Sequence, residues 1–276
     1  DTPHYRAIGE SGWDNTPRFG DDATQVIPED LNCQLYRYEL DVADFSDLLT
    51  EKGMARVWRA RADKRRDLIN RSLWDESSGF YWDYDLRTGE RLRDTPRSLA
   101  SFVPLWAGVA DQDQASRIVE HLPAFEYNHG LVACEQGWDD GTEHNYPTGW
   151  PYSHWYVCAG LRAYGFHHDA SRIAMKWLRL VSNAFVQTGA IRERHNVVDP
   201  GVPPPGRYPP QRGFAWTNGV YAALLARTIF GAEAASKSAQ ADSHPDFPPE
   251  WAGEEVQICL PSYPWPEGVN SKQVAV

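Results

Sequence analysis

The sequence predicts a mainly α-helical protein, and two observations carry this prediction. Apolar residues three and four positions apart, which is the spacing of one helix face, recur in seven segments of the chain. Gly, Pro, Asp and Asn gather in the long connections between these segments. Only residues 80–85 alternate like a short strand, with a turn at residues 88–89, so no substantial sheet is expected.

The predicted helices follow one another mostly in pairs. The apolar periodicity places them at residues 35–49, 55–73, 99–109, 115–122, 150–164, 170–185 and 216–230. The first six form three pairs with a turn inside each, as expected for antiparallel helical hairpins stacked side by side. The connections at residues 10–22, 74–93, 124–148 and 188–213 are long, and such loops at one end of a stack of hairpins would build a site.

The chain is expected to change character after residue 231. Residues 1–231 carry all the predicted helices and form the expected domain. Residues 232–276 are first small and polar and then rich in Pro, without helical periodicity. This composition is typical of a linker, a wrapping segment or a disordered tail.

Composition excludes several classes of function. The 276 residues hold 27 Lys and Arg against 38 Asp and Glu, a net charge of −11, which argues against a nucleic-acid partner. No apolar stretch approaches the ~18 residues of a membrane span. The four cysteines form no CxxC pair and no two histidines stand four apart, so no metal is expected. Aromatic residues make up 13%, which indicates a large core, a surface that stacks on sugar rings, or both.

Three loops hold candidate catalytic carboxylates. In the first, glycines let the backbone turn tightly, so Asp14 could project beside Trp13 into a cleft, where burial would raise its pKa and suit it to donate a proton. The alternative is an Asp that stabilises a turn. In the second loop, Glu143 stands among acid, amide and indole groups. In the third, Glu193 is flanked by Arg192 and by Arg194, which would keep it ionised as a general base or form a structural salt bridge.

Five collinear motifs over residues 10–230 resemble those of the trehalases and, more loosely, of related glucosidases that act on glucose-containing oligosaccharides and glycosylglycerates. They are Glu10-Ser11-Gly12-Trp13-Asp14 with Arg18, Asp30-Leu31-Asn32 with Leu35-Tyr36, Tyr146-Pro147-Thr148-Gly149-Trp150-Pro151, Gly160-Leu161-Arg162-Ala163-Tyr164-Gly165, and Phe214-Ala215-Trp216-Thr217-Asn218-Gly219-Val220. The last motif differs from the family pattern by Ala215 in place of a glycine.

The resemblance implies an (α/α)6 toroid and an inverting glycosidase without a cofactor, acting on an α-glucosidic bond of trehalose or a related small carbohydrate. It implies that Asp14 is the catalytic acid. The side chains that it implies in or around the sugar pocket are Trp13, Arg18, Asn32, Trp150 and Trp216.

The sequence also departs from the family pattern. The resemblance implies a Glu before a Tyr as the base, but this position holds Arg207, whose guanidinium cannot deprotonate water. The related glucosidases carry a base earlier in the chain, which favours Glu193, while Glu143 is a rival. Arg207 and Glu143 are then expected to contact substrate. If neither Glu serves as base, the alternative is a non-catalytic sugar-binding relic.

The seven predicted helices are too few for a closed ring. A toroid of six hairpins needs roughly twice as many, so the N-terminal part of the family domain is expected to be missing. A partial ring exposes apolar helix faces, which soluble monomers rarely tolerate. A missing N-terminal segment, a second chain, or the Pro-rich tail is therefore expected to complete it.

Overall fold

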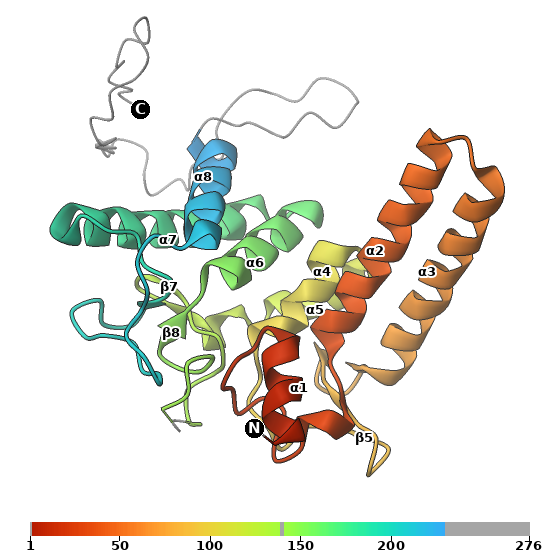
Figure 1. The fold of residues 1–276 in the computed structure, drawn as a ribbon, viewed down its shortest axis with the longest axis horizontal. Helices are drawn as coiled ribbons and strands as arrows, with labels where there is room; N and C mark the ends of the chain where they lie inside the picture. The colour runs from red at the N-terminus through yellow and green to blue at the C-terminus, as the bar shows by residue number, and fades with distance from the viewer. Residues whose placement is uncertain (1, 139–140, 230–276) are drawn as a thin grey trace, which may run out of the picture.

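The computed structural model describes residues 2–138 and 141–229, and Figure 1 shows how they are arranged. Helices dominate, which confirms the predicted mainly helical class. The α-helices are α1 (Pro3–Ser11), α2 (Glu29–Leu48), α3 (Lys52–Ser72), α4 (Val103–Ala107), α5 (Gln112–Val119), α6 (Pro151–Ala163), α7 (His167–Thr188) and α8 (Ala215–Ile229). Short 3-10 turns are η1 (Ala23–Gln25), η2 (Leu99–Phe102) and η3 (Leu122–Ala124). The predicted tail, residues 232–276, lies outside the described residues.

Small antiparallel sheets, of which the sequence predicted only a short strand at residues 80–85, hold the long connections together. The strands, each of two residues, are β1 (Val26–Ile27), β2 (Trp74–Asp75), β3 (Phe80–Tyr81), β4 (Tyr84–Asp85), β5 (Glu90–Arg91), β6 (Glu126–Tyr127), β7 (Gly130–Leu131), β8 (Thr148–Gly149) and β9 (His195–Asn196). They pair as β1-β4-β5, β2-β3, β6-β7 and β8-β9. The strand expected at residues 80–85 is therefore two strands in different sheets. Two-residue strands are too short to show an alternating pattern, so the others left no signal.

Two of the three predicted hairpins form. Helix α2 packs along α3, and α6 packs against α7 (Figure 1). The third prediction is wrong, because α4 packs mainly on α6 and α2 instead of α5. Pro104 and Gly108 limit α4 to five residues, and Gly108 ends it with a φ of 76°. At Gly160, α6 has no side chain, which lets its backbone approach Leu105 of α4 closely.

One helix was not predicted and another begins well before its predicted start, each for an identifiable reason. Helix α1 was not expected, because it is mostly polar and buries only Ile8, although Thr2 caps it and Pro3 occupies its first position. Helix α2 begins six residues before the predicted start at residue 35. Its first turn buries the acidic residues Glu29 and Asp30. Apolar periodicity cannot detect this turn, because it treats acidic residues as exposed.

The core has a large and a small part. The large cluster contains side chains from each helix from α2 through α8. The small cluster includes Ile8, Trp13, Phe19, Cys134 and Trp150. The small cluster brings the first loop against the start of α6. Within the described residues no helix is both long enough and apolar enough to cross a bilayer.

Candidate active site

The loop after α1 sets the direction of Asp14. The helix ends at Gly12, whose φ of 77° is the left-handed conformation that glycine adopts without strain. Trp13 turns inward and is buried, and its indole Nε1 donates to Asp30 Oδ2 at 2.7 Å. Asp14 stays exposed, followed by Asn15 with a φ of 57°. The loop is therefore anchored through Trp13 and leaves the next carboxylate at the surface.

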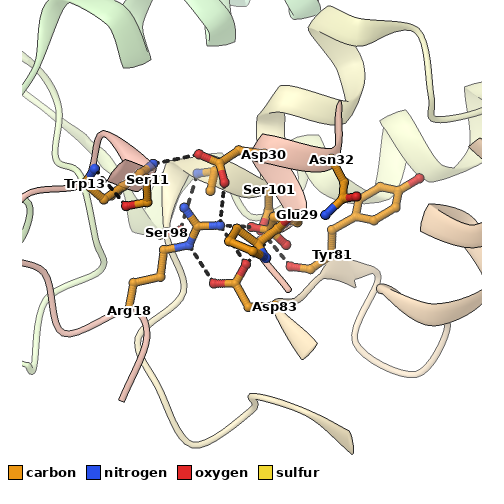
Figure 2. A network of polar contacts seen from close by, with 12 residues as sticks. Ser11, Trp13, Arg18, Glu29, Asp30, Asn32, Tyr81, Asp83, Ser98 and Ser101 are labelled. Atoms are coloured by element: carbon orange, nitrogen blue, oxygen red, sulfur yellow. Dashed lines mark hydrogen bonds and ion pairs between the residues drawn. The ribbon is translucent and has the colours of Figure 1, made fainter. Parts of the chain in front are cut away.

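Arg18 lies beneath this loop in a buried ion-pair network (Figure 2). Its Nε and Nη2 donate to the two carboxylate oxygens of Asp83, both at 2.6 Å, and Nη2 also donates to Asp30 Oδ1 at 2.8 Å. Glu29 Oε1 lies 4.0 Å from the same nitrogen. Because Asp30 also accepts the indole N–H of the loop, Arg18 supports the loop from below and does not line the cavity described next.

A cavity of about 370 Å³ opens beside Asp14. The residues that line it are Tyr5, Arg6, Ile8, Gly9, Asp14, Asn15 and Arg207. Partial burial raises the pKa of Asp14, the charge of Arg207 opposes this effect, and the charge of Glu143 adds to it. A carboxyl group with a raised pKa at the wall of a cavity is suited to donate a proton.

His144 fastens the second loop to the first. Its Nδ1 donates to the Asp14 carbonyl oxygen at 2.6 Å, and its own carbonyl oxygen accepts from the Thr16 hydroxyl at 3.1 Å. The imidazole stacks on Trp150, with centroids 4.0 Å apart and an interplanar angle of 4°. Burial lowers the pKa of His144 to about 3, so the ring is neutral and its proton lies on the nitrogen that faces the carbonyl. The backbone on which Asp14 stands is thus held from two sides.

Glu143, the residue before His144, is buried, and one of its two carboxylate oxygens accepts a hydrogen bond. Its Oε1 accepts from the Arg207 backbone N–H at 2.7 Å, while Oε2 makes no hydrogen bond to any described residue. Arg207 Nε lies 3.9 Å from Oε2. Gly206 permits this close approach, because with its φ of 146° a Cβ would overlap the Glu143 side chain and the Arg194 guanidinium.

Glu193, from the third loop, is buried and held on both oxygens. Arg194 Nη1 donates to Oε2 at 2.6 Å, and the Tyr208 hydroxyl donates to Oε1 at 3.2 Å. Arg194 is fully buried, and its guanidinium lies over the rings of Tyr208 at 4.7 Å and Trp150 at 5.5 Å. The pairing of β8 with β9 brings this loop against the second one. In the sequence analysis Tyr208 marks only the family position that precedes it, and the sequence assigned this tyrosine no role in the site.

Aromatic rings fill the space between the loops. Trp216, at the start of α8, packs edge-on against Trp150, with centroids 5.6 Å apart and an interplanar angle of 84°. The ring centroid of Tyr152 lies 5.6 Å from that of Trp216 and 6.1 Å from that of Trp13. Trp150 is 1% exposed, whereas Trp216 keeps 36% of its surface exposed. Trp216 therefore has surface for a ligand, while Trp150 is a packed support.

Asn32 lies apart from this cavity. Its Oδ1 accepts from Arg65 Nη1 at 3.0 Å, and it lines a second cavity of about 500 Å³ between α2 and α3. The structure thus brings together most of the predicted site residues, namely Trp13, Asp14, Glu143, Trp150, Glu193, Arg207 and Trp216. In residues 2–138 and 141–229, no group of three His, Cys, Asp or Glu side chains is arranged to hold a metal ion.

Glu29, in the network beneath the site, carries a proton. Ser101 Oγ lies 2.8 Å from Glu29 Oε1 and 2.7 Å from the Tyr81 carbonyl oxygen. Because a carbonyl oxygen only accepts, the one hydroxyl proton of Ser101 serves Tyr81, and the carboxyl group must donate the other hydrogen bond. Burial raises the pKa of Glu29 well above its usual value; Asp83 adds to this effect and Arg18 opposes it. The proton reduces the negative charge that Arg18 has to balance.

The Glu29 proton predicts how stability varies with pH. The folded protein binds this proton more tightly than the unfolded chain, so the stabilisation is complete below the unfolded pKa near 4.5 and is lost as pH rises through the raised folded pKa. Glu29→Gln keeps a donor for Ser101 without the charge. As the pH rises above 4.5, its Tm is therefore expected to fall less than that of the wild type.

Thermal unfolding followed by circular dichroism measures this difference. Glu51→Gln is the matched control, because Glu51 is exposed before α3 and makes no side-chain capping bond. Parallel Tm-against-pH curves for the wild type and Glu29→Gln would contradict the assigned proton.

Carboxyl groups from separate loops, set among aromatic rings on a helical scaffold, are the kind of groups that glycoside hydrolases with paired acids use. The sequence matches the family model described as Trehalase over residues 3–228, and the chain belongs to the trehalase family.

Two solved structures are similar to it. Neutral trehalase Nth1 from Saccharomyces cerevisiae is 32% identical with a TM-score of 0.70, over 80% of this chain and 42% of that one. The GH63 mannosylglycerate hydrolase from Thermus thermophilus, solved with glucose, is 25% identical with a TM-score of 0.58, over 72% of this chain and 44% of that one. The matched regions thus span less than half the length of either relative.

Proposed function

We propose that the chain forms part of an inverting glycoside hydrolase that cleaves an α-glucosidic bond of trehalose or a related small glycoside. The observation that carries the proposal is Asp14, which stands at a cavity on a clamped loop and has its pKa raised by partial burial. Similarity to a neutral trehalase supports trehalose as the substrate, and similarity to a mannosylglycerate hydrolase supports the wider class of small glycosides.

In the proposed reaction Asp14 is the general acid. Its proton passes to the glycosidic oxygen as the bond to the anomeric carbon breaks. A second carboxylate takes a proton from the water that attacks the opposite face of the sugar ring, which requires carboxyl groups roughly 6.5–9.5 Å apart. Side chains make both proton transfers, so the reaction uses no cofactor, and an α-glucoside releases β-glucose.

Glu193 is the proposed base. The buried guanidinium of Arg194 supplies a counter-charge for its carboxylate, and Tyr208 occupies only one of the two acceptor sites on Oε1, which leaves the other for water. Glu143 remains the rival, since its Oε2 has no hydrogen-bond partner among the described residues and its charge acts on Asp14.

The helical hairpins are proposed to belong to an (α/α)6 toroid that a further N-terminal segment or a second chain completes. Support comes from α2 and α3, which expose large apolar side chains along their length: Tyr38, Phe45, Leu48, Met54, Val57 and Leu68. These side chains would be covered by the neighbouring hairpin of a closed ring.

A substrate panel tests the proposed activity. Trehalose, glucosylglycerate, mannosylglycerate and gluco-oligosaccharides are incubated with the protein, and proton NMR identifies the first anomer released. With inversion, trehalose releases one β-glucose and one α-glucose, because the departing glucose keeps its α configuration, and the other α-glucosides release β-glucose. Release of α-glucose without any β-glucose contradicts inversion. Sugar binding by calorimetry without any product across the pH range would favour the non-catalytic alternative.

Substitution of the two glutamates decides between the bases. Glu193→Gln is expected to lower kcat by about 10²–10⁴-fold, because the amide cannot take a proton from water. Glu143→Gln is expected to change KM more than kcat, since it keeps an acceptor for the Arg207 backbone N–H. Azide added as an external nucleophile should restore turnover only in the variant that lacks the base. Rescue of Glu143→Gln instead would transfer the role to Glu143.

A further inference from the structure

The arginines that line the Asp14 cavity are more exposed and less hydrogen-bonded than the two buried arginines near it. Arg18 and Arg194 are buried, and each donates to a carboxylate at 2.6 Å. The Arg207 side chain is 60% exposed, and its Nε lies 3.9 Å from Glu143 Oε2, beyond hydrogen-bond distance. Arg6 is exposed on α1 and donates no side-chain hydrogen bond to a residue in the described ranges. Two guanidinium groups on the cavity wall thus keep their donors available.

The backbone of Arg207 is fixed although its side chain is open. Its N–H donates to Glu143 Oε1 at 2.7 Å, and the preceding Gly206 is packed so tightly that a Cβ would overlap neighbouring side chains. The guanidinium therefore starts from a fixed point and lines the same cavity as Asp14. Such a preorganised cation loses less entropy when it binds an anion than one on a free loop.

The charges around the cavity leave a positive excess during the reaction. An acid that is about to donate its proton is neutral, so Asp14 contributes no charge at that moment. Counting only residues 2–138 and 141–229, Arg6 and Arg207 then outweigh the negative charge of Glu143. A neutral disaccharide leaves this excess unmatched, whereas a carboxylate or phosphate matches it and fits the planar fork of a guanidinium.

We propose that Arg207 and Arg6 form an anion subsite beside Asp14, so that the preferred substrate is a glycoside whose leaving group carries a carboxylate or phosphate. This inference rests on the proposed glycosidase function and names the substrate class of the same site. Arg207 is the specificity-determining residue, and Arg6 adds charge from α1.

Matched substrate pairs test the subsite. Glucosylglycerate is compared with glucosylglycerol for a carboxylate, and trehalose 6-phosphate with trehalose for a phosphate. The ratio of kcat/KM for the anionic over the neutral member is expected to exceed ten in at least one pair, and the pair that shows it identifies the anion. Arg207→Gln is expected to reduce this ratio by about 10- to 100-fold, and Arg6→Gln by less.

The ratio separates recognition from a general effect on catalysis. Removing the charge of Arg207 also raises the pKa of Asp14 further, but this changes both members of a pair equally and cancels. Arg207→Lys is expected to restore part of the ratio, because it keeps the charge but not the fork. Arg56→Gln, exposed on α3 away from the cavity, should leave the ratio unchanged.

Calorimetry of the Asp14→Asn variant with the same ligands distinguishes the two proposals. The subsite is supported if the anionic member binds more tightly and if this advantage is lost in the double variant with Arg207→Gln. This holds even if the wild type shows no turnover. In that case only the hydrolase proposal fails. Turnover with equal kcat/KM and equal binding for both members of each pair overturns the subsite and leaves the hydrolase proposal intact.

Discussion

Asp14→Asn is expected to lower kcat on trehalose or the best α-glucoside by about 10²–10⁴-fold, because the amide cannot protonate the departing glycosidic oxygen. The substrate should still bind, since the Asp14 backbone remains held through its carbonyl oxygen by His144. Steady-state kinetics measures the loss, and calorimetry on the variant measures the retained binding.

A substrate with a better leaving group shows whether the lost function is protonation. Fluoride departs without an acid, so α-glucosyl fluoride should be cleaved by Asp14→Asn almost as fast as by the wild type. Asp94→Asn, at an exposed position away from the cavity, is the control and should behave as the wild type. Equal loss on trehalose and on the fluoride would show that Asp14 does not act as the acid.

Arg18→Met is expected to cost about 3–5 kcal/mol of folding free energy, the largest effect on stability among these substitutions. Arg18 is 1% exposed and is hydrogen-bonded to both Asp83 and Asp30. Without it these carboxylates stay buried with no counter-charge, next to Glu29. Urea unfolding followed by tryptophan fluorescence measures the difference.

An exposed ion pair provides the comparison. Arg37 pairs with Asp41 at 3.0 Å along one turn of α2, and both side chains are more than a third exposed. Arg37→Met is therefore expected to cost no more than about 0.5 kcal/mol. A loss for Arg18→Met as small as that for Arg37→Met would mean that the buried network contributes little. If Arg18→Met does not fold, Arg18→Lys gives an intermediate loss that can be measured.

The long helices could be predicted because their apolar faces are regular. The predicted helices at residues 55–73 and 170–185 agree with α3 and α7 to within a few residues. Buried Ala62, Ile69 and Trp177 follow the helical spacing there. Segments whose order comes from polar burial could not be predicted in this way. The first turn of α2 begins with two buried acids, and two-residue strands have no period to detect.

The grouping of the candidate site residues could be predicted in part, and the reason differs from that for the helices. Motifs identify the loops that carry Asp14, Glu143 and Glu193, because loop sequences of this kind are specific. They do not say which side chain faces inward: Arg18 lies under the loop, and Asn32 lines another cavity. These outcomes depend on contacts between residues far apart in the chain, such as Arg18 with Asp83, which no local pattern contains.

Gly206 limits how this site can be re-engineered. The Glu143 side chain and the Arg194 guanidinium occupy the place where a methyl group would stand, so a loop grafted from a homologue keeps its shape only if it also brings glycine to this position. The neighbouring position 207 has the opposite property, since its main chain is pinned while its side chain is open to solvent. Position 207 is therefore a suitable first position to vary when the substrate preference is changed by laboratory evolution. Substitutions there leave the proposed proton-transfer groups in place.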